Sequence, residues 1–130
     1  MVALSIGSYR LIEQIESWAA FAEISVSIVD RADGRPLVSF DEVVQFVDRD
    51  RDIVSIEFGA TYALDSIPNT DRLGVFVRKL VTQPVDTSSI TLAYATCHAV
   101  LACFKESPVI VPYFDRNSRS FVFPSSSPID

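Results

Sequence analysis

Three residues that could carry nucleophilic, redox or metal chemistry lie close together in the chain: Cys97, His98 and Cys103. A helix is predicted over 88–105, and neighbouring residues on a helix point about 100° apart, so Cys97 and His98 do not face each other. Six positions at about 1.5 Å each put the two cysteines about 9 Å apart, which is too far for a disulfide. The spacing also fits no zinc motif. We therefore expect two unpaired buried thiols and a half-buried histidine that bonds to a backbone carbonyl or to water.

A second group of possible ligands is an acidic run in which Asp48, Asp50 and Asp52 alternate with arginines. A calcium loop of the EF-hand type needs glycine at its sixth position and glutamate at its twelfth. Here those positions hold Ile53 and Gly59, and the arginines oppose a cation. The four glycines of the chain are scattered, so no phosphate-binding loop is expected. The sequence predicts no catalytic residues, no metal and no cofactor.

The negative charge of the chain is concentrated in its middle third. Residues 30–71 hold ten acids against four arginines, a net charge of −6, which equals that of the whole chain. Such an acidic region repels nucleic acid and speeds the encounter with a positively charged protein. The simpler interpretation is a solvated face that keeps the protein in solution.

Hydrophobic spacing gives the elements that must position these residues. Leu11, Ile12, Ile15 and Trp18 recur at helical spacing, and the segment 73–81 follows the i, i+3, i+4, i+7, i+8 pattern. Ser39 and Glu42 resemble a capping box, and Ser8 and Ser88 resemble N-caps. The expected helices span residues 9–22, 40–47, 73–81 and 88–105.

Alternating and turn-bounded segments indicate strands. Residues 2–6, 24–28, 35–38 and 54–58 are expected strands, and 109–123 is an expected C-terminal hairpin. The fold class is therefore predicted as α+β: one domain over 1–123 with a small, mostly antiparallel or mixed sheet against about four helices. The expected order is roughly (β)αβ(β)αβααββ. A short Ser/Pro tail at 124–130 has nothing to bury.

The compartment is predicted from two absences. The longest apolar segment, 90–104, is shorter than the ~18 residues of a membrane span and is interrupted by polar residues. Unpaired cysteines suit a reducing environment. A cytoplasmic protein without a membrane partner is expected.

These observations favour an acidic inhibitor of the immunity-protein or antitoxin type, which neutralises a basic partner such as a toxin nuclease. Carboxylates of such an inhibitor stand in for phosphates in the basic cleft of the partner. The residues expected to bind the partner are Asp33, Glu42, Asp48, Asp50 and Asp52.

Two other functions stay open at this point. One is a small enzyme or ligand-binding domain whose pocket lies near Tyr94 and His98, with Tyr62 and Tyr113 as further polar-tipped groups. The other is a subunit of a larger or homo-oligomeric assembly, joined through the 109–123 hairpin.

Overall fold

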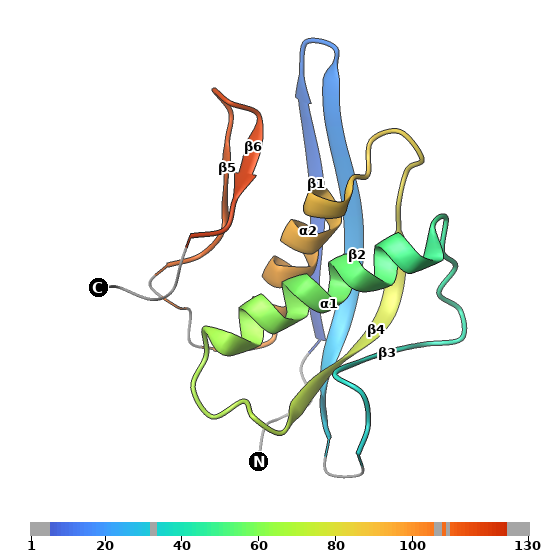
Figure 1. Ribbon diagram of the computed structural model, residues 1–130, viewed down its shortest axis with the longest axis vertical. Helices are drawn as coiled ribbons and strands as arrows, with labels where there is room; N and C mark the ends of the chain where they lie inside the picture. The colour runs from blue at the N-terminus through green and yellow to red at the C-terminus, as the bar shows by residue number, and fades with distance from the viewer. Residues whose placement is uncertain (1–5, 32–33, 106–107, 109, 125–130) are drawn as a thin grey trace.

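The computed structural model describes residues 6–31, 34–105, 108 and 110–124 of the chain. This part of the chain forms a four-stranded sheet, two helices that cover one of its faces, and a separate two-stranded sheet near the C-terminus (Figure 1). The expected strand at residues 2–6 and the tail beyond Pro124 lie almost entirely outside the described residues. In chain order the elements are β1 (Ile6–Ile15), β2 (Trp18–Asp30), β3 (Val38–Phe40), α1 (Arg49–Asp65), β4 (Leu73–Val81), α2 (Ser89–Leu101), β5 (Tyr113–Asp115) and β6 (Ser120–Val122).

The helix expected at 9–22 is wrong, because this segment forms the β1–β2 hairpin. The two strands pair antiparallel over ten residues, from Ile6 opposite Ser27 to Ile15 opposite Trp18. Glu16 makes the tight turn with a positive φ of 55°. Both faces of the hairpin carry apolar residues, and two interleaved strand faces imitate helical spacing in the sequence. The strand expected at 24–28 is confirmed as part of β2.

The helix expected at 73–81 is also wrong, because the segment is strand β4. It pairs antiparallel with β2, and the register shifts between Ser25 and Val26. Val75 and Val77 face the core before this bulge, and Leu80 packs against the core after it. A bulge reverses the alternation of a strand, so the inward residues became three apart, as they are in a helix.

Helix α1 replaces two expected elements, and a loop replaces the expected helix before it. The expected helix at 40–47 is a loop after β3, in which the amide of Val43 donates to the side chain of Asp41 at 3.0 Å. The acidic run expected to be a loop begins the helix, with Asp48 as N-cap. The strand expected at 54–58 lies inside the helix, because α1 has apolar residues on two faces and not on one.

Two expectations near the C-terminus are confirmed. The helix predicted over 88–105 is α2, which begins after the N-cap Ser88 and ends at Leu101. The C-terminal hairpin is present as the antiparallel pair β5 and β6. The described residues therefore contain two helices and six strands, which contradicts the predicted fold with about four helices.

The layers follow from the strand order β1-β2-β4-β3, in which β3 runs parallel to β4 and the other neighbours are antiparallel. A parallel pair needs a crossover, and α1 supplies it between β3 and β4. Buried residues of β2 and β4, such as Ile24 and Val77, pack against Ile56 of α1 and Leu92 of α2. No helix among the described residues is both long and apolar enough to cross a membrane.

The β5–β6 hairpin packs against the far part of the β1–β2 hairpin, beyond the helices (Figure 1). Phe121 joins a small second core with Leu11 and Tyr94. Trp18 stacks on Phe114 with ring centroids 5.4 Å apart. The hairpin is attached by this aromatic packing and by two ion pairs, Arg116 with Glu13 and Arg119 with Glu16.

Candidate functional site

An apolar groove lies between α1 and α2, on the side of the helices that faces away from the sheet. Its volume is about 580 Å³. Val54 and Phe58 of α1 and Ile90 and Ala93 of α2 line it. Val54, Phe58 and Ile90 expose 65%, 50% and 42% of their surface. Three large apolar side chains gathered on one face indicate a binding surface more strongly than scattered ones do.

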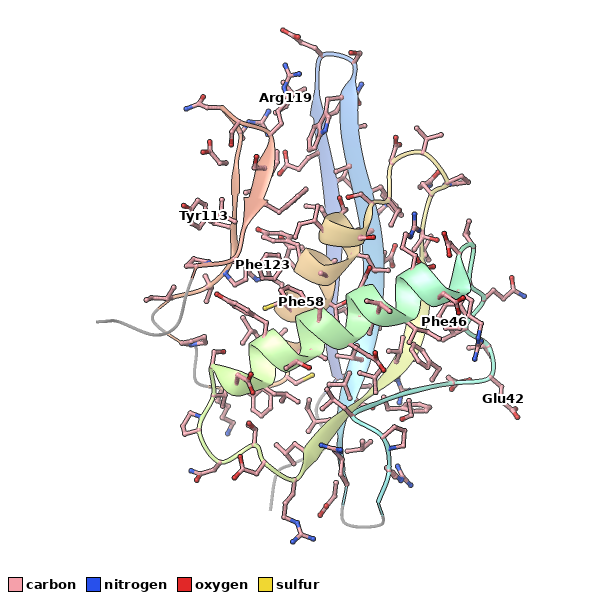
Figure 2. All side chains as sticks on the ribbon, in the orientation of Figure 1. Glu42, Phe46, Phe58, Tyr113, Arg119 and Phe123 are labelled. Carbon is pink, nitrogen blue, oxygen red and sulfur yellow. The ribbon has the colours of Figure 1, made fainter. Side chains whose placement is uncertain are left out.

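A close crossing of the two helices gives the groove its shape. Gly59 of α1 lies against the backbone of Ala93, and a Cβ at Gly59 would collide with the Ala93 carbonyl oxygen and reach 3.0 Å from Thr96 Cβ. Phe58 sits next to this crossing and contacts Phe123, with ring centroids 5.3 Å apart (Figure 2). The groove therefore starts at the crossing and opens toward the N-terminal ends of both helices.

Polar residues form the opposite end of the groove, although the surface that they turn toward it is almost entirely apolar. Asp50, Arg51 and Ser55 of α1 and Ser89 of α2 complete its lining. The first turn of each helix carries unpaired amides with partial positive charge, and Asp50 lies in the first turn of α1. This end is thus built from two helix starts, of which α1 carries the acids Asp50 and Asp52 in its first turn and α2 carries none.

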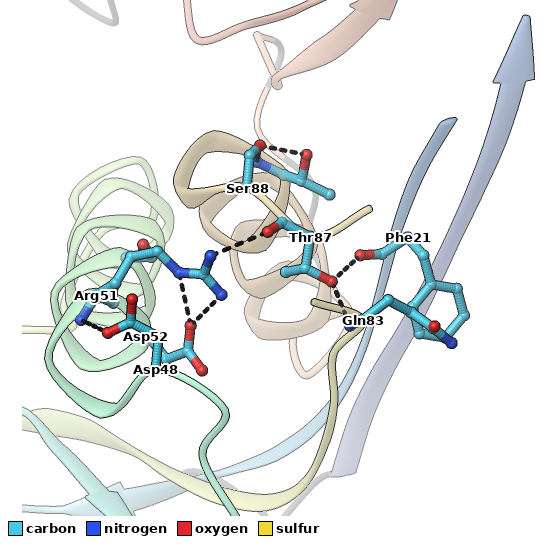
Figure 3. Close-up of polar contacts among 9 residues, drawn as sticks. Phe21, Asp48, Arg51, Asp52, Gln83, Thr87 and Ser88 are labelled. Carbon is cyan, nitrogen blue, oxygen red and sulfur yellow. Dashed lines mark hydrogen bonds and ion pairs between the residues drawn. The ribbon is translucent and has the colours of Figure 1, made fainter. Parts of the chain in front are cut away.

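A buried ion pair fixes the two helix starts relative to each other. Arg51 donates from Nε and Nη2 to Oδ1 of Asp52, at 3.1 and 2.8 Å, and from Nη1 to the carbonyl of Thr87 at 3.1 Å (Figure 3). The hydroxyl of Thr87 donates to the carbonyl of Phe21 at 2.6 Å and accepts from the amide of Gln83 at 2.8 Å. These contacts join α1, the β4–α2 connection and β2, so they hold the two helix starts beside the groove in place.

The five residues expected to bind the partner do not form one surface. Asp33 lies outside the described residues. Glu42 is exposed at the outer edge of the β3–α1 loop, on the side of the molecule opposite β5–β6 (Figure 2). Asp48 is the N-cap of α1 and accepts the amide of Arg51 at 3.3 Å. Asp52 is fully buried, so it offers no charge to a partner, whereas Asp50 lines the groove.

Val54, Phe58 and Ile90 line the groove, and none of them was predicted as a site residue from the sequence. Glu57 is exposed and lies seven residues after Asp50, which places the two acids about 10 Å apart along one side of α1. The available signal was the i, i+4 spacing of Val54 and Phe58, which instead reads as an alternating strand.

Of the two residues expected at the alternative pocket, His98 lines a hollow of about 420 Å³ together with Leu101 and Phe104, whereas Tyr94 is buried in the small second core. His98 stacks on Tyr9 with ring centroids 5.0 Å apart, and its Nε2 lies 2.9 Å from the carbonyl of Pro112. Burial lowers the pKa of His98, and the Pro112 carbonyl acts in the opposite direction. This confirms the expected half-buried histidine bonded to a backbone carbonyl. Burial raises the pKa of Tyr94 strongly, with Tyr9 adding to the effect, so its hydroxyl stays protonated at neutral pH.

The two cysteines are free and buried, as expected. Burial raises the pKa of Cys97 to about 12 and that of Cys103 to about 11. Both thiols are therefore unreactive at neutral pH, because the thiolate is the nucleophile and the metal ligand. Among the residues described, no three His, Cys, Asp or Glu side chains are grouped so that they could hold a metal ion.

Comparisons with known proteins give a likeness in fold alone. No protein-family model matches the chain, and no curated protein matches it. The chain is similar to the crystal structure of ttk003000868 from Thermus thermophilus, with a TM-score of 0.59 and 14% identity. The matched region covers 75% of this chain and 15% of that chain. At this identity the similarity concerns the arrangement of strands and helices.

Proposed function

We propose that the chain is an acidic protein-binding inhibitor of the immunity-protein or antitoxin type, which acts in the cytoplasm and receives a positively charged partner on its helix face. The observation that carries the proposal is the apolar groove, which Asp50 lines, with the exposed Glu57 seven residues further on the same side of α1. Interfaces combine an apolar centre with a polar rim, and this face has both.

The bases near the groove are engaged elsewhere, which leaves the rim acidic. The guanidinium of Arg51 is held by the buried carboxylate of Asp52. Arg49 lies over the ring of Phe46, 5.1 Å from its centroid, on the far side of α1 from the groove. An acidic rim attracts a basic protein during diffusion and disfavours nucleic acid.

The face of the sheet opposite the helices differs in charge from the helix face, and this difference supports the helix face as the surface that binds a basic partner. There Glu23 lies between Arg10 and Lys79, at 3.6 and 2.9 Å, so two bases surround one acid. A basic partner is therefore drawn to the helix face and not to the open face of the sheet.

The test begins with the protein encoded next to this chain in its genome, because an inhibitor of this type is expressed with its target. The two proteins are co-expressed, and complex formation is measured by calorimetry at low and high salt. We expect a complex whose affinity falls with salt and falls at least tenfold in the double variant Asp50→Lys and Glu57→Lys. The double variant Asp65→Lys and Asp71→Lys makes the same charge change away from the groove and is the matched control. A complex equally sensitive to both double variants, or no complex, contradicts the proposal.

A further inference from the structure

The positions of two acids on α1 restrict the shape of the ligand that the groove can bind. Asp50 and Glu57 are seven residues apart on α1, which corresponds to about 10 Å along the axis and about 20° around it. Val54 lies between them, and Phe58 follows Glu57 on the side toward α2. The two acids therefore lie along one side of α1, where Asp50 reaches the groove, and Val54 and Phe58 lie beside them toward α2.

The groove offers side chains but few free main-chain groups. Its walls are two helices, whose backbone amides and carbonyls bond within each helix except at the ends. The N-terminal amides of α1 and α2 are partly satisfied by the caps Asp48 and Ser88. An extended peptide needs a sheet edge to pair its backbone, and this groove has none. A ligand that satisfies its own backbone, namely a helix, fits the groove without leaving buried polar groups.

A helix laid along this groove repeats the spacing of the acids. Two basic residues seven apart on such a helix lie about 10 Å apart on one side, opposite Asp50 and Glu57. Apolar residues at i, i+3 or i+4 between them face Val54, Phe58 and Ile90. The volume of about 580 Å³ accommodates a few apolar side chains and not a whole helix, so the helix lies across the opening and inserts one face.

We infer that the groove binds an amphipathic basic helix of the partner, with two lysines or arginines seven residues apart beside an apolar stripe. This inference rests on the proposed function, because it specifies which part of a basic partner the helix face receives. Charge complementarity selects a basic helix over a second copy of this acidic chain, whose own helices are bordered by the same acids.

The experiment uses three labelled synthetic peptides of about 18 residues and the full chain. The first peptide has a leucine stripe and two lysines seven apart, the second replaces these lysines with glutamates, and the third is the first with a central proline. Proline removes helix without changing charge, at a cost of about 3 kcal/mol. Fluorescence anisotropy measures binding, and amide chemical shifts report whether Val54, Phe58 and Ile90 are contacted.

We expect the basic helical peptide to bind at least tenfold more tightly than either of the other two. The variant Val54→Ser is expected to weaken this binding severalfold, and Val85→Ser, which changes an exposed valine away from the groove, is the matched control. Equal binding of the helical and proline peptides overturns the helix inference, but it does not contradict a basic partner. Peptide binding that changes neither with Val54→Ser nor with the charge reversal of Asp50 and Glu57 overturns the proposed function as well. A third outcome is that no peptide binds, that the chain associates with itself, and that Val54→Ser abolishes this association. The groove would then bind a second copy, which also overturns the inference.

Discussion

Arg51 and Asp52 are neighbours in the chain, and their side chains form an ion pair in which the carboxylate is completely buried. Oδ1 of Asp52 accepts two bonds from the guanidinium, whereas Oδ2 has no partner among the described residues. The third nitrogen of the guanidinium bonds to the carbonyl of Thr87, just before α2. The pair therefore connects the starts of the two helices that form the groove.

Removing the carboxylate leaves Arg51 part-buried without its counter-charge. We expect Asp52→Ala to lower the free energy of unfolding by about 3–5 kcal/mol, as is typical for one partner of a buried pair. Urea denaturation followed by circular dichroism measures this change. Glu57→Gln neutralises an exposed acid on the same helix and is expected to change stability by less than about 0.5 kcal/mol. Similar small effects of both substitutions would show that the buried pair does not stabilise the fold.

The sequence predicted elements well where one periodicity dominates. Helix α2 is buried nearly all round and begins at a clear N-cap, Ser88, and it was predicted correctly. The β1–β2 hairpin was not, because its two faces together imitate a helix and its pairing is a tertiary contact. Strand β4 was missed because the bulge opposite Ser25 and Val26 changes the phase of its alternation, and a bulge leaves no local mark in the sequence.

The candidate site was predicted in part, through its charge. Asp50 lies where the acidic run suggested a binding surface, but Asp52, two residues later, faces the interior. A helix places residues two apart on opposite sides, whereas a loop does not, so the error followed from taking the run as a loop. The apolar part of the site needed the correct assignment of α1. A strand would place Val54, Ile56 and Phe58 on one face, whereas in the helix Ile56 is buried and Val54 and Phe58 are exposed.

The crossing at Gly59 predicts a strong effect of a single methyl group. Gly59→Ala gains about 1 kcal/mol in helix propensity, but its Cβ collides with the Ala93 carbonyl oxygen and forces the helices apart. We expect a net loss of about 1–3 kcal/mol in the free energy of unfolding, measured by thermal and urea denaturation. Thr61→Ala, at an exposed position two residues later, is the control and is expected to be nearly neutral. A more stable Gly59→Ala would mean that the helices do not pack as closely as described.

The C-terminal hairpin is predicted to depend on aromatic packing more than on its ion pairs. Phe121 is 9% exposed and contacts Phe114 and Tyr94, with ring centroids 4.7 and 4.8 Å away. Phe121→Ala is expected to lower stability by about 3 kcal/mol and to shift the emission of Trp18, the single tryptophan, to longer wavelength. Arg119→Ala removes an exposed pair with Glu16 and is expected to cost less than about 1 kcal/mol without an emission shift. If Arg119→Ala instead cost more stability than Phe121→Ala, the ion pairs and not the aromatic contacts would hold the hairpin in place.

The lowered pKa of His98 predicts a dependence of stability on pH. Burial disfavours the charged imidazole in the folded chain, whereas the unfolded chain protonates near the ordinary value of about 6.5. Above this value neither state binds the proton, so His98 contributes no pH dependence there. As the pH falls through about 6.5, the unfolded state takes up the proton first, and the free energy of unfolding decreases until the lower folded pKa is reached.

The variant His98→Gln separates this effect from the carboxylates, because it keeps every acid of the chain. The free energy of unfolding of both proteins is measured in urea at about pH 7.5 and about pH 5.5, on either side of the ordinary histidine value. We expect the original chain to lose more stability than His98→Gln over this interval. The variant also loses the stacking on Tyr9, but this loss is the same at both pH values and does not affect the comparison. An equal loss in both proteins would show that His98 protonates as easily in the folded chain as in the unfolded one, and that its bond to the Pro112 carbonyl cancels the effect of its burial.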